Sequence, residues 1–415
     1  MRGRTCLIIL LFIVLAAFLG GCQRGQPSVA KTEIPLLIFQ QVPEGQAAFR
    51  GIWNPEAGTL EVDANPSFAL KGAEGTDISP LYWDGGPQVY LFTEHEGKAA
   101  VTSHGSTLQA SVVQHTGLPP EAVAPVFYAS GDRWYVAYGL RNNLGIVETG
   151  PNGTKKWLFS AQEAPSNKSQ NPNSKAGVFT DPKTGLLVDI VTPDPKGPQP
   201  PDPDSLPEKG MKNLPSPGNG EVVPLFLAER EDRLVVLAVL NRPTGSEELF
   251  LVRIDGAGKA VWVPVARKGG PQCSFIAGAG VKVGLCGQHL YLDSPCGEEI
   301  QSLSLDEEKP RLVGKEGLTR ELRALKAENA PTEGQVRPGF GAYRGLLLVS
   351  TLTGGAQGRG DETEWLLAFK EKEGRLLGKM AVRLETGEAA VYANGATKRH
   401  QLPSPVARLL YPAGW

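Results

Sequence analysis

Three cysteines and one histidine lie close together in the chain and are its best candidates for chemistry: Cys273, Cys286, His289 and Cys296. Thiolate and imidazole groups are common zinc ligands, so one interpretation is a tetrahedral metal site. The spacing matches no common zinc module, and cysteines outside the cytoplasm tend to be oxidised. We therefore favour one disulfide among Cys273, Cys286 and Cys296 with the third thiol free, and the sequence does not choose among the three pairings.

No other group of residues has the spacing of a catalytic motif. The remaining histidines are scattered along the chain: His95, His104, His115 and His400. None has a Ser, Cys or carboxylate partner in a recognisable pattern, so we interpret them as exposed loop residues. Asp202 and Asp204 lack the spacing of a calcium loop, and the chain has no glycine-rich phosphate loop and no nucleophile elbow. The sequence therefore predicts no catalytic and no cofactor-binding residue.

Composition narrows the class of protein. The chain has 415 residues, of which 41% are hydrophobic and 21% charged, as in ordinary globular proteins. Its 50 glycines and 34 prolines favour many turns and short strands over long helices. The net charge of −2 argues against a nucleic-acid partner, because such proteins carry a basic surface.

The N-terminus predicts where the protein lies in the cell. Arg2 and Arg4 precede an apolar run at residues 6–19, which is shorter than the roughly 20 residues of a membrane-spanning helix. The run ends in Leu19-Gly20-Gly21-Cys22, which resembles the lipobox of bacterial lipoproteins. That resemblance implies removal of a signal peptide at residues 1–21, a lipid on Cys22 and a tether at 22–33. We expect the domain at 34–415 to be anchored outside the cytoplasm, on the cell membrane or the outer membrane.

A short hairpin pattern recurs along the chain, as in residues 125–138, PVFYASGDRWYVAY. Apolar and β-branched runs there flank a turn at Ser130-Gly131-Asp132. The first apolar residue after each such turn marks the register of the repeat: Val89, Trp134, Leu186, Leu234, Leu290 and Leu346. The period is about 50 residues with no helical spacer, which is typical of radially repeated four-stranded sheets.

The stretch LFLVRIDGAGKAVWVPV at residues 249–265 is similar to the end of a blade in quinoprotein-like and WD40-like β-propellers. Together with the repeat, this resemblance implies an all-β chain folded as a propeller of about seven four-stranded blades, with six and eight left open. A pair of β-sandwiches is the alternative. Strand-like residues at 34–62 and near the C-terminus predict one blade shared between the two ends, which removes exposed sheet edges. The recurring Trp134, Trp157 and Trp262 are expected to pack between blades.

Two segments interrupt the repeat. Residues 192–220 are rich in proline and predict a solvated loop inserted between strands. Residues 318–329 predict the one short helix, because Leu318, Leu322 and Leu325 fall on one helical face.

We expect the function of a lipid-anchored binding or scaffolding platform for a protein or glycan partner of the cell envelope. Propellers place ligands on loops that vary between blades, and the units differ most at the insertion, the cysteine-rich unit and the helix. The alternative is an envelope enzyme, either one that acts on polysaccharide or a quinoprotein-type dehydrogenase.

Overall fold

The computed structural model describes the chain between Thr32 and Pro412, with gaps. The described residues are 32–43, 45–71, 81–83, 85, 89–95, 98–104, 111–151, 153–161, 221–242, 246–266, 274–276, 281–294, 299–328, 338–354 and 362–412. The expected signal peptide at 1–21, the lipidation site Cys22 and the insertion at 192–220 lie outside these ranges and stay predictions. Within the described residues the fold is all-β, with six antiparallel sheets and one α-helix.

Sheets 1 to 3 come from the first part of the chain. Sheet 1 contains β1 (Ile34–Val42), β2 (Gly45–Asn54), β3 (Thr59–Val62), β4 (Phe68–Lys71) and β27 (Val406–Leu410). Sheet 2 contains β5 (Leu81–Trp83), β6 (Val89–His95), β7 (Lys98–His104) and β8 (Ser111–His115). Sheet 3 contains β9 (Val123–Ser130), β10 (Arg133–Leu140), β11 (Asn143–Gly150) and β12 (Gly153–Ser160).

Sheets 4 to 6 follow in the same order. Sheet 4 contains β13 (Val222–Arg230), β14 (Arg233–Asn241), β15 (Glu247–Ile254) and β16 (Ala260–Pro264). Sheet 5 contains β17 (Val283–Cys286), β18 (His289–Asp293), β19 (Ile300–Ser304) and β20 (Val313–Gly314). Sheet 6 contains β21 (Gly339–Tyr343), β22 (Leu346–Thr353), β23 (Thr363–Lys370), β24 (Arg375–Arg383), β25 (Glu388–Ala393) and β26 (Ala396–Gln401).

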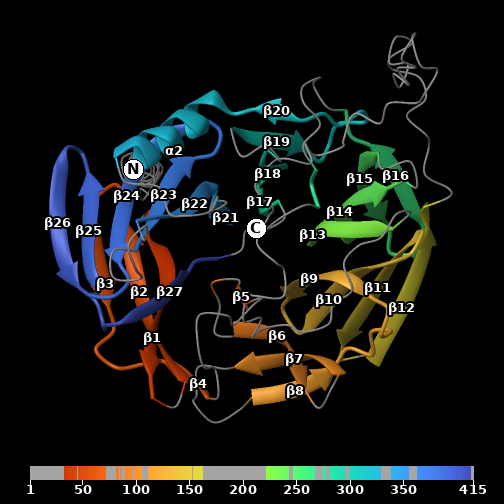
Figure 1. Ribbon diagram of the computed structural model, residues 1–415, viewed down its shortest axis with the longest axis horizontal. Helices are drawn as coiled ribbons and strands as arrows, with labels where there is room; N and C mark the ends of the chain where they lie inside the picture. Colours follow the sequence, from red (N-terminus) through yellow and green to blue (C-terminus); the bar gives the residue numbers. More distant parts are fainter. Residues whose placement is uncertain are drawn as a thin grey trace, which may run out of the picture.

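The six sheets follow one another around a centre in chain order (Figure 1). Sheet 6, in blue, returns beside sheet 1, in red, and the C-terminus lies near the centre. The two ends of the chain share sheet 1, because β27 pairs antiparallel with β1 from Leu37 and Leu410 onward. The expected sharing of one sheet between the termini is therefore confirmed. From the C-terminal part of the chain, β27 joins sheet 1, whereas β25 extends sheet 6.

The hairpin repeat is confirmed where the structure describes it. The marks Val89, Trp134, Leu234, Leu290 and Leu346 begin the second strand of sheets 2 to 6, at its first or second residue. Four of these hairpins have a two-residue turn, as the pairing of Ser130 with Arg133 and of Cys286 with His289 shows. Local alternation and turn residues thus determine where the second strand of each of sheets 2 to 6 begins.

The expectation of seven sheets is wrong for the described part of the chain, and six, the alternative left open, is what it contains. A seventh sheet built around Leu186, which is outside the described residues, would have to lie between sheets 3 and 4. Those two sheets contact each other directly. The Val222 N–H donates to the Arg141 carbonyl at 2.8 Å, and a Cβ on Gly139 would lie 1.8 Å from the Val222 oxygen. Sheets 3 and 4 are therefore direct neighbours in the described part of the chain.

The two sides of this arrangement of six sheets differ in their connections. The first strand of each of sheets 2 to 6 ends at a hairpin turn, and contacts join these turns to the neighbouring sheet, such as Tyr90 to Gly131 at 3.0 Å and His289 to Glu371 at 2.7 Å. We call this side the turn face. The opposite side, where each sheet connects to the next, is the loop face. The strands that flank the three longest connections meet these connections on the loop face; the connections are 161–221, 265–282 and 315–338. The longest connection between strands on the turn face is 305–312.

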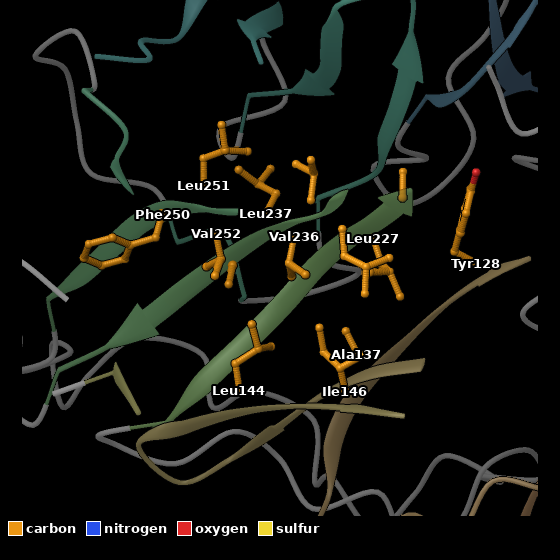
Figure 2. Packing of buried hydrophobic residues seen from close by; sticks show 14 of the residues in the cluster. Tyr128, Ala137, Leu144, Ile146, Leu227, Val236, Leu237, Phe250, Leu251 and Val252 are labelled. Atoms are coloured by element: carbon orange, nitrogen blue, oxygen red, sulfur yellow. The ribbon is translucent and has the colours of Figure 1, made fainter. Parts of the chain in front are cut away.

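Apolar residues fill the junctions between neighbouring sheets. The largest cluster runs through sheets 2 to 5, and smaller ones lie between sheets 1 and 6, between sheets 5 and 6, and between sheets 1 and 2. Figure 2 shows Leu144 and Ile146 of sheet 3 opposite Leu227 and Val236 of sheet 4. Such burial of apolar surface is the main force that holds the sheets together.

The recurring tryptophans lie where they were expected. Trp134 is 4% exposed and Trp262 is 6% exposed, within the largest cluster. Trp157 is half-buried, and its indole nitrogen lies 2.8 Å from where a Cβ on Gly258 would stand. These side chains are packing residues at sheet junctions.

The helix α2 (Glu316–Glu328) confirms the predicted one at 318–329, shifted by two residues at its start. Leu318, Leu322 and Leu325 are all buried and pack in the cluster between sheets 5 and 6. The Thr319 hydroxyl accepts a hydrogen bond from the Ile300 N–H of β19 at 3.0 Å. The helix therefore braces the junction between these two sheets.

One turn is strained and offers a test of the hairpin geometry. Glu231 and Asp232 join β13 to β14 with φ of 49° and 59°, a conformation that Asn-Gly adopts with little cost. We expect the double substitution Glu231→Asn and Asp232→Gly to stabilise the protein by about 1 kcal/mol, measured by thermal unfolding. The matched control is Gly345→Ala, at φ 77° in open space, which should destabilise it by a similar amount. A shift of both variants in the same direction would contradict this assignment.

Candidate functional site

A cluster of polar side chains on the turn face contains two of the residues singled out in the sequence. Cys286 and His289 are register partners across the turn between β17 and β18. The Glu371 carboxylate, which follows β23 of sheet 6, lies 2.7 Å from His289 Nδ1 through Oε1. The Tyr291 hydroxyl donates to the same oxygen at 3.1 Å. A thiol, an imidazole, a phenol and a carboxylate therefore meet at the junction of sheets 5 and 6.

The electrostatics of this cluster do not suit a nucleophile. Cys286 is fully buried, and burial together with the charge of Glu371 raises the pKa of its thiol to about 12. Burial is also the main cause that raises the pKa of Tyr291, with Glu371 adding to it. The thiolate is the reactive form of cysteine, so a thiol that stays protonated at neutral pH is inert.

The same arrangement recurs two sheets earlier with arginine in the histidine position. Arg133 directly follows its turn, as His289 does, and Tyr135 stands two residues later, as Tyr291 does. Both bond to Glu229 of the next sheet, Arg133 at 3.0 Å and the Tyr135 hydroxyl at 3.4 Å. A repeated contact with different chemistry joins neighbouring sheets, so we interpret the His289 cluster as structural. The spacing of Arg133 and Tyr135 matches that of His289 and Tyr291 in the sequence and was a signal for it.

The cysteine interpretations are partly outside the described chain. Cys273 and Cys296 are not among the described residues, so the pairing of these two and the zinc site stay predictions. Cys286 is a free thiol in the structure, so neither disulfide through it is formed. Among the described residues, no group of three histidine, cysteine or acidic side chains is placed to hold a metal ion.

The scattered histidines are not loop residues. His95, His104 and His115 are the last residues of β6, β7 and β8, and His400 lies within β26, where it is half-buried. The expectation of loop positions was wrong, because each of these residues is part of a pairing register.

A second polar cluster lies between sheet 6 and β27, and the sequence did not indicate it. The Glu364 carboxylate of β23 accepts a hydrogen bond from the Leu409 N–H at 3.0 Å. The Tyr411 hydroxyl lies 2.7 Å from the hydroxyl of Ser350 in β22. Gly339 makes room for this ring, because a Cβ there would lie 2.6 Å from the Tyr411 oxygen. The only local signal was a charged residue directly before the apolar run of β23.

Glu364 is half-buried, and burial raises its pKa from 4.5 to about 7. The bond from the Leu409 N–H and the charge of Arg408 oppose this shift. Burial also raises the pKa of Tyr411, and Glu364 adds to that shift. A carboxyl group with this pKa serves either as an acid–base group or as a pH-dependent contact to the closing strand.

Comparisons with known proteins give no family. No protein-family model matches the sequence, and no curated protein matches it. Similar solved structures include a protein from Lactobacillus plantarum, with 15% identity, 91% of this chain and 99% of that chain covered, and a TM-score of 0.42. A functionally unknown protein from Desulfotomaculum acetoxidans has 8% identity, coverage of 92% and 99%, and a TM-score of 0.38. A Trypanosoma rangeli sialidase has 9% identity, coverage of 88% and 53%, and a TM-score of 0.34. Because these TM-scores are low, the similarities support no conclusion about function.

Within the described ranges, the structure contains no helix of the length and apolarity that crossing a bilayer requires.

The raised pKa of Glu364 predicts that stability depends on pH. Between about pH 4.5 and 7 the folded state holds a proton that the unfolded state has lost, so the free energy of unfolding falls as pH rises through this window. Glu364→Gln is neutral at every pH, so it should lose this part of the dependence. We expect it to exceed the natural protein in stability at pH 8 by on the order of 1 kcal/mol, measured by denaturant unfolding.

Glu362→Gln, two residues earlier, is the control and should leave the pH dependence unchanged. A Glu364→Gln variant whose stability follows the same pH curve as the natural protein would show that this carboxyl group does not titrate in the window.

Proposed function

We propose that the chain is a lipid-anchored, extracytoplasmic β-propeller of six blades whose loop face is a binding platform for a protein or glycan partner of the cell envelope. The observation that carries this proposal is the difference between the two faces. Short turns and the two ends of the described chain, Thr32 and Pro412, lie on the turn face, whereas the longest connections join the loop face. Long connections on a rigid scaffold are where binding residues concentrate.

Contacts at every junction support a closed ring. Sheet 1 packs on sheet 2 through a cluster that includes Phe39 and Trp83. It packs on sheet 6 through a cluster that includes Ile38 and Leu366. A ring closed by a sheet with strands from both termini has no open end, so the sheets keep fixed positions and present a rigid rim.

The tether orients the ring relative to the membrane. β1 begins on the turn face, and the Thr32 hydroxyl bonds to the Glu56 carboxylate on the same face at 2.7 Å. A lipid on Cys22 would be joined to Thr32 by a segment that reaches at most ~36 Å when fully extended. The turn face would then lie toward the bilayer and the loop face toward the partner.

An enzyme remains a second candidate, and Glu364 is the observation that favours it. A partly exposed carboxyl group with a pKa of about 7 is suited to proton transfer in an envelope hydrolase or lyase acting on polysaccharide. Cleavage of an acidic or neutral polysaccharide by the full chain, abolished in Glu364→Gln, would favour this candidate over the platform.

The anchor is tested at Cys22. In cells of the natural host, Cys22→Ala should lose incorporation of labelled palmitate and move from the membrane fraction, because the thiol that carries the lipid is gone. Cys6→Ala, inside the expected signal peptide, is the control and should keep both. Palmitate labelling that survives in Cys22→Ala would contradict the lipobox assignment.

The orientation is tested at the two ends of one strand. Asp132 lies before β10 on the turn face and Asn142 lies after it on the loop face, and both are exposed. A photo-crosslinking residue at Asn142 should capture a protein or glycan partner in whole cells, whereas the same residue at Asp132 should not. Capture at Asp132 alone would place the partner on the turn face and overturn the proposal.

A further inference from the structure

Sheet 6 departs from the four-stranded unit by one added hairpin, β25 and β26. One face of this hairpin has a clear structural role. Ala389 and Val391 pack in the cluster between sheets 6 and 1, and the Asn394 side chain donates to the Glu56 carbonyl at 2.9 Å. The Lys398 ammonium donates to the Ala57 carbonyl at 3.4 Å. The hairpin therefore clasps sheet 1 and reinforces the ring closure.

The opposite face of the hairpin is charged and exposed. Glu388 of β25 binds two arginines, Arg383 of β24 at 3.2 Å and Arg399 of β26 at 2.8 Å. The side chains of these arginines are 64% and 77% exposed. Each guanidinium has five N–H donors, so one bond to a shared carboxylate leaves most of them available to another anion.

Aromatic rings lie beside these arginines on the same face. Tyr392 of β25 is a register partner of Lys379 in β24, and its ring stacks on Trp365 of β23 with centroids 5.9 Å apart. The Lys379 ammonium lies 5.5 Å from the Trp365 centroid and 5.4 Å from the Tyr392 centroid. Tyr392 is half-buried, so part of this residue is exposed on the same face.

We propose that this surface, the basic face formed by Lys379, Arg383, Tyr392 and Arg399, binds an acidic polysaccharide. Two arginines share the single Glu388 carboxylate, and Lys379 adds a third cation further along the same face, so this surface carries a local excess of positive charge that attracts anions. The arginine forks match carboxylate groups, and the ring of Tyr392 offers a flat apolar surface to a sugar ring.

The shape and the position of the basic face favour a polymer over a lipid surface. Exposed arginines on neighbouring strands suit a linear chain with repeated charges. The basic face lies along the strands, whereas the segment that leads to Cys22 joins the turn face, so the membrane is not the occupant that the geometry favours. The preference for a polymer over a membrane rests on the proposed lipid anchor, whereas the charge of the basic face does not depend on the partner of the loop face.

Binding to polygalacturonate tests the proposal, with the full chain in a nonionic detergent and titration calorimetry at low salt. The natural protein should bind polygalacturonate and not neutral dextran. The double substitution Arg383→Gln and Arg399→Gln should weaken binding by about tenfold. Glu388→Gln removes the competing carboxylate and should strengthen binding by about threefold, which a misfolded variant would not do.

A matched control lies on the turn face of the same sheet, where Lys370 and Arg375 surround Glu373 at 3.6 and 3.2 Å. Replacing both cations with glutamine there should leave binding unchanged. An equal loss in the two double variants would mean non-specific charge attraction and overturn the proposal. The absence of polygalacturonate binding would also overturn it. The same holds if Arg383 and Arg399 are needed for binding to phosphatidylglycerol vesicles but not for binding to polygalacturonate.

Discussion

The pairing of β27 with β1 is the contact on which the rest of this structure depends. It brings together segments from opposite ends of the chain, from Leu37 with Leu410 to Gln40 with Val406. Closing so long a loop costs conformational entropy, which non-local contacts must offset. Further bonds hold the last strand in place, from the Leu409 N–H to Glu364 and from the Ala342 N–H to the Pro412 carbonyl at 3.2 Å. The added hairpin β25–β26 covers the same junction from outside.

Hydrogen bonds between neighbouring sheets on the turn face explain why His289 and Tyr291 have a structural role. The Glu371 carboxylate accepts from His289 and Tyr291, and Glu229 accepts from Arg133 and Tyr135 at the equivalent junction. A half-buried carboxylate is stable only with such partners. The repeat shows that these positions recur for packing and that the chemistry of any one of them is secondary.

Function is therefore sought where the repeat is broken. Three breaks are visible: the long connections of the loop face, the titrating Glu364 beside the closing strand, and the uncovered face of the added hairpin in sheet 6. They involve different residues, so a platform on the loop face and a polysaccharide site on the hairpin are compatible. Each has its own chemical signature, which allows each to be tested by itself.

The sequence by itself determined the hairpins, their register marks, the helix and the sharing of one sheet between the termini. These features follow from alternation, turn residues and helical spacing, which act over a few neighbouring residues. The described residues form one sheet fewer than expected, because the mark at Leu186 lies outside them and sheets 3 and 4 contact each other directly.

Only the tertiary structure decided which polar groups meet. Glu371 lies 82 residues from His289, and Tyr411 lies 61 residues from Ser350. Residues so far apart have no shared local pattern, and their contacts arise from how the sheets pack around the centre. The pKa of Glu364 likewise depends on tertiary contacts, because burial raises it and a hydrogen bond from the Leu409 N–H of β27 lowers it. Local rules thus built the units, and the closure of the chain on itself determined which polar groups share a junction.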